Sequence, residues 1–201
     1  ALKKGKQVVV LVPEIALTGQ IVRRFLRRFG DDVVVMHSQL SQGEKRNNWL
    51  RMQNGTSHIC IGARSAVFAA AQSIGLFIVD EAHDSSYKQD EAPRYHAVAV
   101  ARQRAAYYGC PVVLGSATPA LADYYRALQG EYVLVELKER VGHRPLPAVQ
   151  VVDMRDELAR GNYRVVSDAL LTLLEETLAA RQQAIILLNR RGFSTFVMCR
   201  K

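Results

Sequence analysis

The sequence predicts an α/β fold in which a parallel sheet is flanked by helices. Its most apolar runs are short and show no polar alternation, as in residues 7–12 (QVVVLV) and 76–79 (LFIV). Such runs are typical of strands that are covered on both faces of a parallel sheet. Helical patterns lie between these runs, and the alternation of strand and helix indicates a doubly wound domain.

The predicted elements follow one another in a regular order. The strands cover residues 7–12, 33–36, 58–61, 76–79 and 112–114. The helices cover residues 16–29, 41–53, 96–108 and 119–128. The second helix has a defined start, because Ser41 and Glu44 have the spacing of a capping box, in which each side chain binds the backbone N–H of the other residue.

A change of composition separates this domain from the C-terminal part of the chain. Residues 138–147 (KERVGHRPLP) are charged and contain two prolines, which is typical of a linker. We therefore expect one domain over residues 1–137 and the start of a second α/β unit over residues 148–201. The elements expected in the second unit are a strand at residues 148–154, a helix at 167–181 with Ser167 as its N-cap, and a strand at 184–189.

The charge balance favours a polyanionic partner. Lysine and arginine number 27 against 19 acidic residues, which gives a net charge of +8. This excess suits nucleic acid or an anionic surface, and a basic surface that is merely solvated remains the alternative. The basic residues include Arg23, Arg24, Arg27 and Arg28 on one predicted helix, where like charges four residues apart repel each other. A polyanion beside that helix would relieve the repulsion.

The sequence favours a cytoplasmic protein without a membrane span. No apolar run reaches the roughly 18 residues of a transmembrane helix, and no signal peptide is recognisable. Three widely spaced cysteines, Cys60, Cys110 and Cys199, argue for a reducing compartment and against a disulfide framework. The first residue is Ala1 and not Met, so we expect that N-terminal sequence is missing.

Polar residues follow the predicted strands at the point where each strand ends. In an open α/β sheet, ligands bind at the carboxyl ends of the strands. We therefore expect one polar edge of the sheet that carries a ligand site. Its members are Pro13-Glu14, His37-Ser38, Gly62-Ala63-Arg64-Ser65, Asp80-Glu81-Ala82-His83 and Gly115-Ser116-Ala117-Thr118.

The pair Asp80 and Glu81 has the chemistry that phosphoryl transfer from a nucleotide requires. One carboxylate can hold Mg²⁺ through water, and the other can orient and deprotonate an attacking water. A carboxylate pair in a solvated loop is the alternative. The imidazole of His83 adds to the pattern, because it can bond to the hydroxyl groups of Ser116 and Thr118 on the next strand end.

The loop after these residues combines aromatic and charged side chains. Tyr87, Tyr95 and His96 are interleaved with Lys88 and Arg94. Aromatic rings stack on nucleic-acid bases and cations bind phosphates, so the loop is a candidate contact with DNA. A surface loop that happens to carry tyrosines is the alternative.

Several motifs, in this order, resemble the PriA family of replication-restart DNA helicases. The motifs are VPEIALT, HSQLS, GARSAVFA, VDEAHDSSYKQDEAPRYHA, GSATP and LLNRRGF, and they span nearly the whole chain. The resemblance implies a superfamily 2 helicase motor with two RecA-like lobes and ATP between them. Residues 1–137 then form most of lobe 1, and residues 148–201 form the start of lobe 2.

The resemblance also implies an activity and its partners. The full-length protein would be an ATP-dependent helicase or translocase that moves 3′-to-5′ on DNA, in replication restart and primosome assembly at stalled forks. Its partners would be forked and single-stranded DNA, primosome proteins and single-stranded DNA-binding protein. A non-catalytic DNA-binding remnant and another superfamily 2 DNA translocase are the alternatives.

Matching motifs imply roles for individual residues. Asp80 would bind Mg²⁺, Glu81 would activate water, and His83 would couple to Ser116 and Thr118. The segment from Ser85 to His96 would sense DNA, and Glu14 and Arg64 would line the DNA path. Cys199 would be the first half of a pair from a zinc-binding insertion that carries Zn²⁺ in the full-length protein.

Two departures from the family pattern affect these expectations. No phosphate-binding loop of the form G-x-x-x-x-G-K-[ST] occurs in the 201 residues. We therefore expect that these residues alone neither hydrolyse ATP nor unwind DNA efficiently. Val98 and Ala99 also stand where the family has Arg-Asp, so the helix after the loop is expected to differ.

Overall fold

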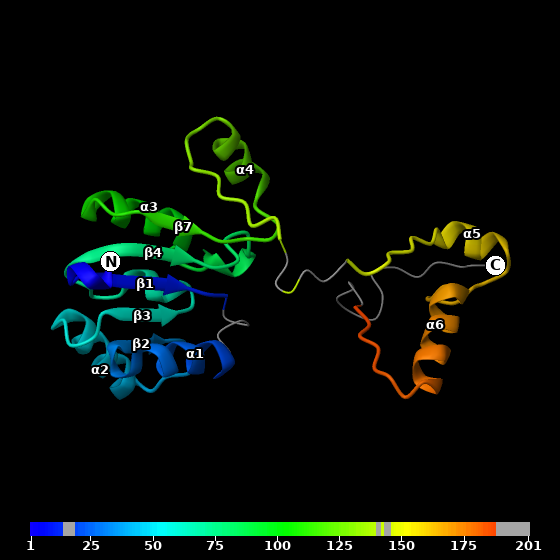
Figure 1. Ribbon diagram of the computed structural model, residues 1–201, viewed down its shortest axis with the longest axis horizontal. Coiled ribbons are helices and arrows are strands. Elements are labelled where there is room, and N and C mark those ends of the chain that lie inside the picture. Colours follow the sequence, from blue (N-terminus) through cyan, green and yellow to red (C-terminus); the bar gives the residue numbers. More distant parts are fainter. Residues whose placement is uncertain (14–18, 140–141, 143–145, 188–201) are drawn as a thin grey trace. The chain divides into compact units, whose positions relative to one another are not determined.

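The computed structural model describes residues 1–13, 19–139, 142 and 146–187, which divide between two compact units, Ala1–Glu136 and Leu137–Lys201. The first unit contains a five-stranded sheet with the strand order β2-β3-β1-β4-β7. All neighbouring strands in it are parallel. The strands are β1 (Gln7–Leu11), β2 (Val33–Met36), β3 (Ile59–Gly62), β4 (Ile74–Val79) and β7 (Val112–Leu114). The predicted parallel α/β sheet is therefore confirmed (Figure 1).

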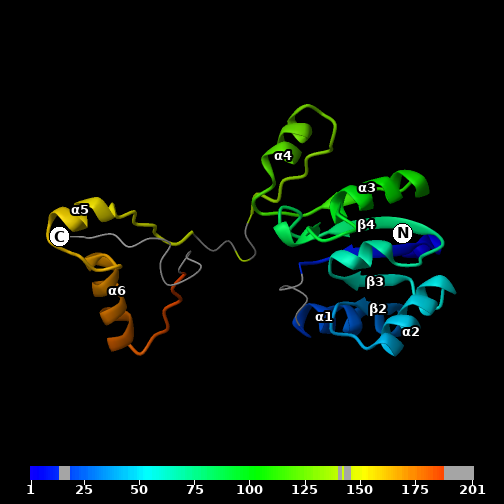
Figure 2. The ribbon, with the colours of Figure 1, turned by 180° about the vertical axis from the view of Figure 1, so that it is seen from behind.

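Helices cover both faces of this sheet, because successive side chains of a strand point to opposite faces. On one face, Val9 and Phe77 pack in a core cluster with Met52 of α2 (Gln42–Gln53) and Ala101 of α3 (Ala97–Tyr108). On the other face, a second cluster that includes Val8, Val10 and Ile61 packs against Ile21, Phe25 and Phe29 of α1 (Gly19–Phe29). The helix α4 (Leu121–Leu128) stands apart from the sheet (Figure 2).

Short elements complete the first unit. Four 3-10 helices cover Leu2–Lys4, Gly30–Asp32, Arg64–Phe68 and Ser85–Tyr87. The strands β5 (Lys88–Gln89) and β6 (Tyr95–His96) form an antiparallel hairpin, which we call the charged hairpin. The predicted capping box is confirmed, because Glu44 N donates to Ser41 Oγ at 3.3 Å and Ser41 N donates to Glu44 Oε2 at 2.8 Å.

The described residues of the second unit form two helices, α5 (Met154–Ala159) and α6 (Asp168–Ala179). The prediction of Ser167 as an N-cap is confirmed, since its Oγ accepts a hydrogen bond from Leu170 N at 3.2 Å. Glu157, which is buried, also supports this helix start by accepting from Asp168 N at 2.8 Å.

The two strands predicted in the second unit are wrong where the structure describes them. Residues 148–153 form no strand and Met154 already belongs to α5, while residues 184–187 form no regular element. Residues 188 and 189 lie outside the described residues. A strand needs a neighbouring strand to satisfy its backbone N–H and C=O groups, and an apolar sequence pattern alone does not show that such a neighbour exists. Ile185 accordingly is fully exposed to solvent, as it would not be within a covered sheet.

Candidate functional site

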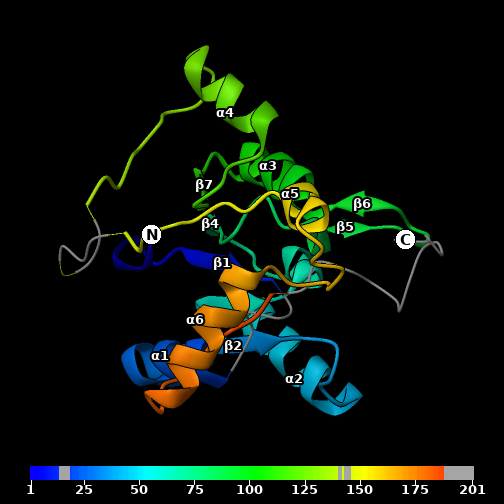
Figure 3. The ribbon, with the colours of Figure 1, turned by 90° about the vertical axis from the view of Figure 1, so that its right-hand side faces the viewer.

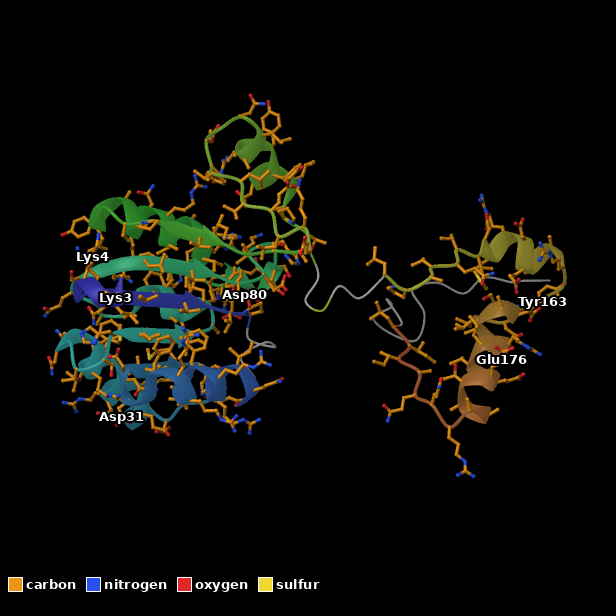
Figure 4. All side chains as sticks on the ribbon, viewed as in Figure 1. Lys3, Lys4, Asp31, Asp80, Tyr163 and Glu176 are labelled. Atoms are coloured by element: carbon orange, nitrogen blue, oxygen red, sulfur yellow. The ribbon has the colours of Figure 1, made fainter. Side chains whose placement is uncertain are left out.

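The carboxyl ends of the five strands lie at one edge of the sheet, because all of the strands are parallel. The polar sets predicted from the sequence are therefore brought to the same edge, and Figure 4 shows Asp80 there, at the end of β4. Glu14 lies outside the described residues. Backbone bonds hold the edge together, since Asp80 N donates to Leu11 O and Ala82 N donates to Gly115 O, both at 2.9 Å.

Close backbone packing at this edge explains one glycine. A Cβ on Gly62, at the end of β3, would lie 2.2 Å from Met36 O of the neighbouring β2. That distance is below any van der Waals contact, so a side chain here would push the two strand ends apart. Close packing of β3 against β2 therefore explains why the first residue of the GARSAVFA motif is a glycine.

The two carboxylates are open to solvent to different degrees, because Asp80 is exposed and Glu81 is half-buried. Asp80 Oδ1 accepts a hydrogen bond from Glu81 N at 3.1 Å. Glu81 has a φ of 45°, in the left-handed region, which costs a residue with a side chain about 1 kcal/mol or more. This conformation places Glu81 Oε2 3.5 Å from His83 Nδ1. Within the described residues, neither carboxylate forms an ion pair with a lysine or an arginine.

The imidazole of His83 joins two strand ends. Its Nδ1 lies 2.7 Å from Ser116 Oγ, and its Nε2 lies 3.4 Å from Thr118 Oγ1. Ser116 Oγ also accepts a hydrogen bond from Thr118 N at 3.0 Å, which fixes the hydroxyl in place. The hydrogen bond predicted between His83 and these hydroxyl groups is present, and it connects the end of β4 with the end of β7.

The charged hairpin follows the carboxylates along the chain (Figure 3). Lys88, Arg94 and His96 are exposed, and Tyr95 is half-buried with its ring edge-on to Phe68 at 5.0 Å between centroids. Lys88 Nζ lies 3.4 Å from a carboxylate oxygen of Asp90, and Arg94 Nε donates to Asp90 O at 3.0 Å. The hairpin therefore presents both cations and an aromatic ring at the surface.

The sequence predicts that Tyr87 stacks on DNA bases, but the structure places its ring in the core. Its side chain is fully buried in the core, and its hydroxyl donates a hydrogen bond to Asp80 O at 2.6 Å. Burial and the nearby carboxylates, Asp80 first among them, raise the pKa of Tyr87, so the hydroxyl remains a donor. A ring in this position cannot reach a base, and the prediction is corrected for this residue.

Arg64, which its motif places along the DNA path, also contacts the backbone of the loop after β4. Its Nη1 donates to Ser86 O at 3.1 Å and to Lys88 O at 2.5 Å. The guanidinium thus binds the backbone of the loop that leads into the charged hairpin. The four arginines of α1, in contrast, are all exposed.

Phe68 is a residue that sequence reasoning missed. It is 45% exposed although it is large and apolar, and it contacts the ring of Tyr95. The signal was present in the GARSAVFA motif, where Phe68 is the only bulky aromatic residue among small ones. Its exposure depends on how the 3-10 helix Arg64–Phe68 is turned, which the motif alone does not reveal.

The described residues contain no group of three or more His, Cys, Asp or Glu side chains that could hold a metal ion. Mg²⁺ needs only one or two protein carboxylates besides water and phosphate oxygens, so the exposed Asp80, with the half-buried Glu81 next to it, fits this ion. Burial raises the pKa of the Cys60 thiol to about 12 and also raises that of Cys110, which leaves both as poor metal ligands. Cys199, the predicted zinc ligand, lies outside the described residues.

No helix in the part of the chain that the structure describes is long and apolar enough to cross a membrane.

Comparison with known proteins matches the first unit to a helicase family. The family model described as DEAD/DEAH box helicase matches residues 1–127, which include the sheet and every described residue of the polar edge. A solved structure, the Hef helicase domain of Pyrococcus furiosus, covers 63% of this chain at 15% identity, with 25% of its own chain covered and a TM-score of 0.41. That score is too low to support any inference.

Curated relatives match nearly the whole chain. The replication restart protein PriA of Bacillus subtilis (strain 168) is 55% identical over 199 residues, and PriA of Synechocystis sp. is 51% identical over 206 residues. Each alignment covers 99% of this chain, but only 25% and 24% of the respective relative. The chain therefore spans about a quarter of the length of these relatives.

Proposed function

The chain belongs to the DEAD/DEAH box helicase family, and we propose that the full-length protein couples ATP hydrolysis to movement along DNA. The observation that carries this proposal is the network at the carboxyl edge, where His83 lies 3.5 Å from the carboxylate of Glu81 and 2.7 Å from the hydroxyl of Ser116. Such a network can relate the state of a nucleotide to the end of a neighbouring strand. The similarity to PriA proteins over 99% of this chain supports DNA as the substrate.

Asp80 and Glu81 have separate roles in this proposal. Asp80, exposed at the end of β4, would hold Mg²⁺ through water ligands. Bound Mg²⁺ supplies positive charge that offsets the negative charge of the phosphate groups of ATP. Glu81 would orient a water molecule for attack and accept its proton, which a carboxylate beside an imidazole can do.

His83 would act as the coupling residue together with Ser116 and Thr118. It lies 3.5 Å from Glu81 through the same Nδ1 that contacts Ser116 Oγ at 2.7 Å. A change in the position or charge of Glu81 therefore alters the bond to Ser116. Because Ser116 and Thr118 follow β7, such a change is transmitted across the sheet edge.

The DNA contacts in this proposal come from the charged hairpin. Lys88, Arg94 and His96 are exposed and would bind phosphates, while Tyr95 would stack on a base. Glu14 is kept as a residue of the DNA path on the strength of its motif alone. The exposed arginines of α1 would add sequence-independent attraction for DNA.

The finer assignments rest on the named relatives and on the shared motifs. We propose that the protein acts in replication restart, as the name of its relatives says of them. Movement 3′-to-5′ on forked or single-stranded DNA, primosome proteins and single-stranded DNA-binding protein as partners, a Zn²⁺ site that begins with Cys199, and a cytoplasmic location belong to the same proposal. Residues 1–137 and 148–201 would contribute to two RecA-like lobes, joined by residues 138–147.

The test is an ATPase assay on the full-length protein with and without single-stranded DNA. We expect turnover that rises with DNA, and DNA affinity that falls steeply with salt because phosphate contacts dominate. DNA binding without any turnover would contradict the proposal and identify a DNA-binding protein without catalysis. Turnover that ignores DNA would remove DNA as the substrate.

A further inference from the structure

The segment between the carboxylates and the charged hairpin is attached to the sheet by two side chains from different places. Tyr87, the last residue before the hairpin, donates from its hydroxyl to the main-chain oxygen of Asp80 at 2.6 Å. Its ring is fully buried in the core cluster that includes Phe77 and Val79 of β4. Tyr87, next to Lys88, is therefore bonded directly to Asp80, the first residue of the carboxylate pair.

Arg64 supplies the second attachment. It reaches from the 3-10 helix after β3 and donates to the carbonyl groups of Ser86 and Lys88, on either side of Tyr87. Lys88 is the first residue of the hairpin. The two attachments thus meet at the base of the hairpin, one from the end of β4 and one from the end of β3.

The turn between the attachments is rigid in its own right. Asp84 Oδ1 accepts a hydrogen bond from Ser86 N at 2.7 Å, and these bonds from Ser86 hold the pKa of Asp84 below its usual range. The loop from Asp80 to Ser86 is therefore closed by Tyr87 and stiffened by Asp84. These bonds connect Lys88 with Asp80 and with the turn between them, so a displacement of Lys88 strains them.

We propose that Arg64 and Tyr87 are positioning residues that make the carboxylates at the end of β4 respond to what the charged hairpin binds. DNA held by the hairpin displaces Lys88, and the displacement reaches Asp80 through the Tyr87 hydroxyl and the Arg64 guanidinium. The inference rests on the proposed function, since it concerns how DNA controls ATP hydrolysis at that site. It assigns neither residue a contact with DNA or nucleotide, so both act through other groups.

The structure offers a matched control for each residue. Tyr108 also donates its hydroxyl to a main-chain oxygen, that of Ala71, at 3.0 Å. Arg104 also binds two carbonyl groups, those of Val67 and Ala69. Both controls belong to α3 of the same unit. Tyr108 holds Ala71, which is not part of the polar edge, whereas Arg104 holds the end of the 3-10 helix that begins with Arg64 and therefore reports a general loosening of that helix.

The experiment compares Tyr87→Phe and Arg64→Lys with Tyr108→Phe and Arg104→Lys in the full-length protein. The measurement is ATP turnover as single-stranded DNA is titrated to saturation, together with the thermal unfolding midpoint. We expect Tyr87→Phe and Arg64→Lys to lower the stimulation at saturating DNA about fivefold, the equivalent of one lost hydrogen bond. The DNA concentration for half-maximal stimulation should change less than about twofold, and the control variants should keep the full stimulation.

Other outcomes separate this inference from its alternatives. An Arg64→Lys variant that needs more DNA but reaches the wild-type plateau would mean that Arg64 contacts DNA, which overturns its positioning role. Equal loss of stimulation in the control variants would mean a general effect of stability and would also overturn it. Wild-type protein without DNA-stimulated turnover would overturn the proposed function itself, before any variant is considered.

A second measurement keeps the inference testable if a variant has too little activity to assay. Hydrogen exchange at the amides of residues 88–96 should be faster in Arg64→Ala than in wild type, because alanine has no donor for the bond to Lys88 O. Exchange in the strands β1 and β3 should stay unchanged. Unchanged exchange in the hairpin would contradict the positioning role of Arg64.

Discussion

The two edges of the same sheet use polar residues in opposite ways. At the edge where the strands begin, the side chain of Gln7 is buried, and its Nε2 donates to Met52 O at 2.7 Å and Ser57 O at 3.1 Å. Its Oε1 accepts from Gln72 N at 2.9 Å and Ser73 N at 3.3 Å. These four bonds use the full capacity of the amide group, so nothing is left for a ligand.

At the edge where the strands end, the polar groups remain open to solvent. Asp80 is exposed, and Glu81 adopts a left-handed conformation that costs stability. Satisfied and buried polar groups stabilise a fold, whereas carboxylates open to solvent, one of them in a strained backbone conformation, are typical of a site that binds a ligand. The first edge therefore holds the sheet together, and the second edge is the candidate site of the proposed function.

The largest expected effect is on catalysis at the edge where the strands end, which we call the open edge. Replacing Glu81 by Gln removes the base but keeps the shape, so we expect ATP turnover of the full-length protein to fall at least ~100-fold. ATP binding and the unfolding midpoint should stay close to wild type, which nucleotide titration and thermal melting would check. An equal loss from Glu131→Gln, an exposed glutamate after α4, would show that the effect is not specific to the edge.

The next effect is on stability at the edge where the strands begin, which we call the closed edge. Replacing Gln7 by Ala leaves the buried carbonyl groups of Met52 and Ser57 without their donor, which we expect to cost roughly 3 kcal/mol in the free energy of unfolding. Denaturant titration measures this loss, and Gln39→Ala on the exposed surface serves as the control, with an expected change within about 0.5 kcal/mol. A Gln7→Ala protein that keeps its stability but has lost ATP turnover would mean that Gln7 serves the function and not the fold, which contradicts this contrast.

Tyr95 tests whether the charged hairpin belongs to the open edge. Stacking on a base contributes about 1–3 kcal/mol, so Tyr95→Ala should weaken single-stranded DNA binding roughly tenfold and lower DNA-stimulated turnover more than DNA-free turnover. Tyr125→Ala, at an exposed tyrosine of α4, is the control. If both turnover rates fell together, Tyr95 would be a packing partner of Phe68 and no more.

Ser116 tests the link across the edge. Ser116→Ala removes the 2.7 Å contact with His83, which we expect to lower DNA unwinding about fivefold at an unchanged affinity for ATP. Thr118→Val should have a smaller effect, because its hydroxyl is 3.4 Å from the ring. A strand-displacement assay measures both variants, and a larger effect from Thr118→Val would contradict this order.

The smallest effect is a pH dependence at the turn that carries the hairpin. The pKa of Asp84 is lower in the folded protein, so the stabilisation it gives is present above the unfolded pKa of about 3.9 and is lost as pH falls through the folded value. The difference in unfolding midpoint between wild type and Asp84→Asn should therefore be constant above about pH 5 and shrink below about pH 4. A difference that grows on acidification would show that this sign is wrong.

The polar edge could be predicted because it depends on local signals. A parallel sheet collects all of its strand ends on one side, so the contact between His83 and Ser116 follows once the strands are recognised. The role of Tyr87 could not be predicted in this way. An aromatic residue in a charged loop is compatible with exposure or burial, and the choice depends on the core that forms beneath it.

The attachment by Arg64 was also beyond the sequence, because its partners lie 22 and 24 residues further along the chain. In the second unit, the same apolar pattern that correctly predicted β1 and β4 gave strands at residues 148–154 and 184–189 that the described residues do not form. β1 pairs with β3 and β4 on its two sides. An apolar pattern therefore predicts a strand only where neighbouring strands are available to pair with it.

The most direct test of the contrast between the two edges is hydrogen exchange of the full-length protein, measured with and without a non-hydrolysable ATP analogue, Mg²⁺ and single-stranded DNA. We expect slower exchange at residues 80–83, 88–96 and 115–118, and no change at residues 54–58 and 109–111, which precede strands β3 and β7. Protection confined to residues 54–58 and 109–111 would contradict this contrast, because the ligands would then bind at the edge where the strands begin.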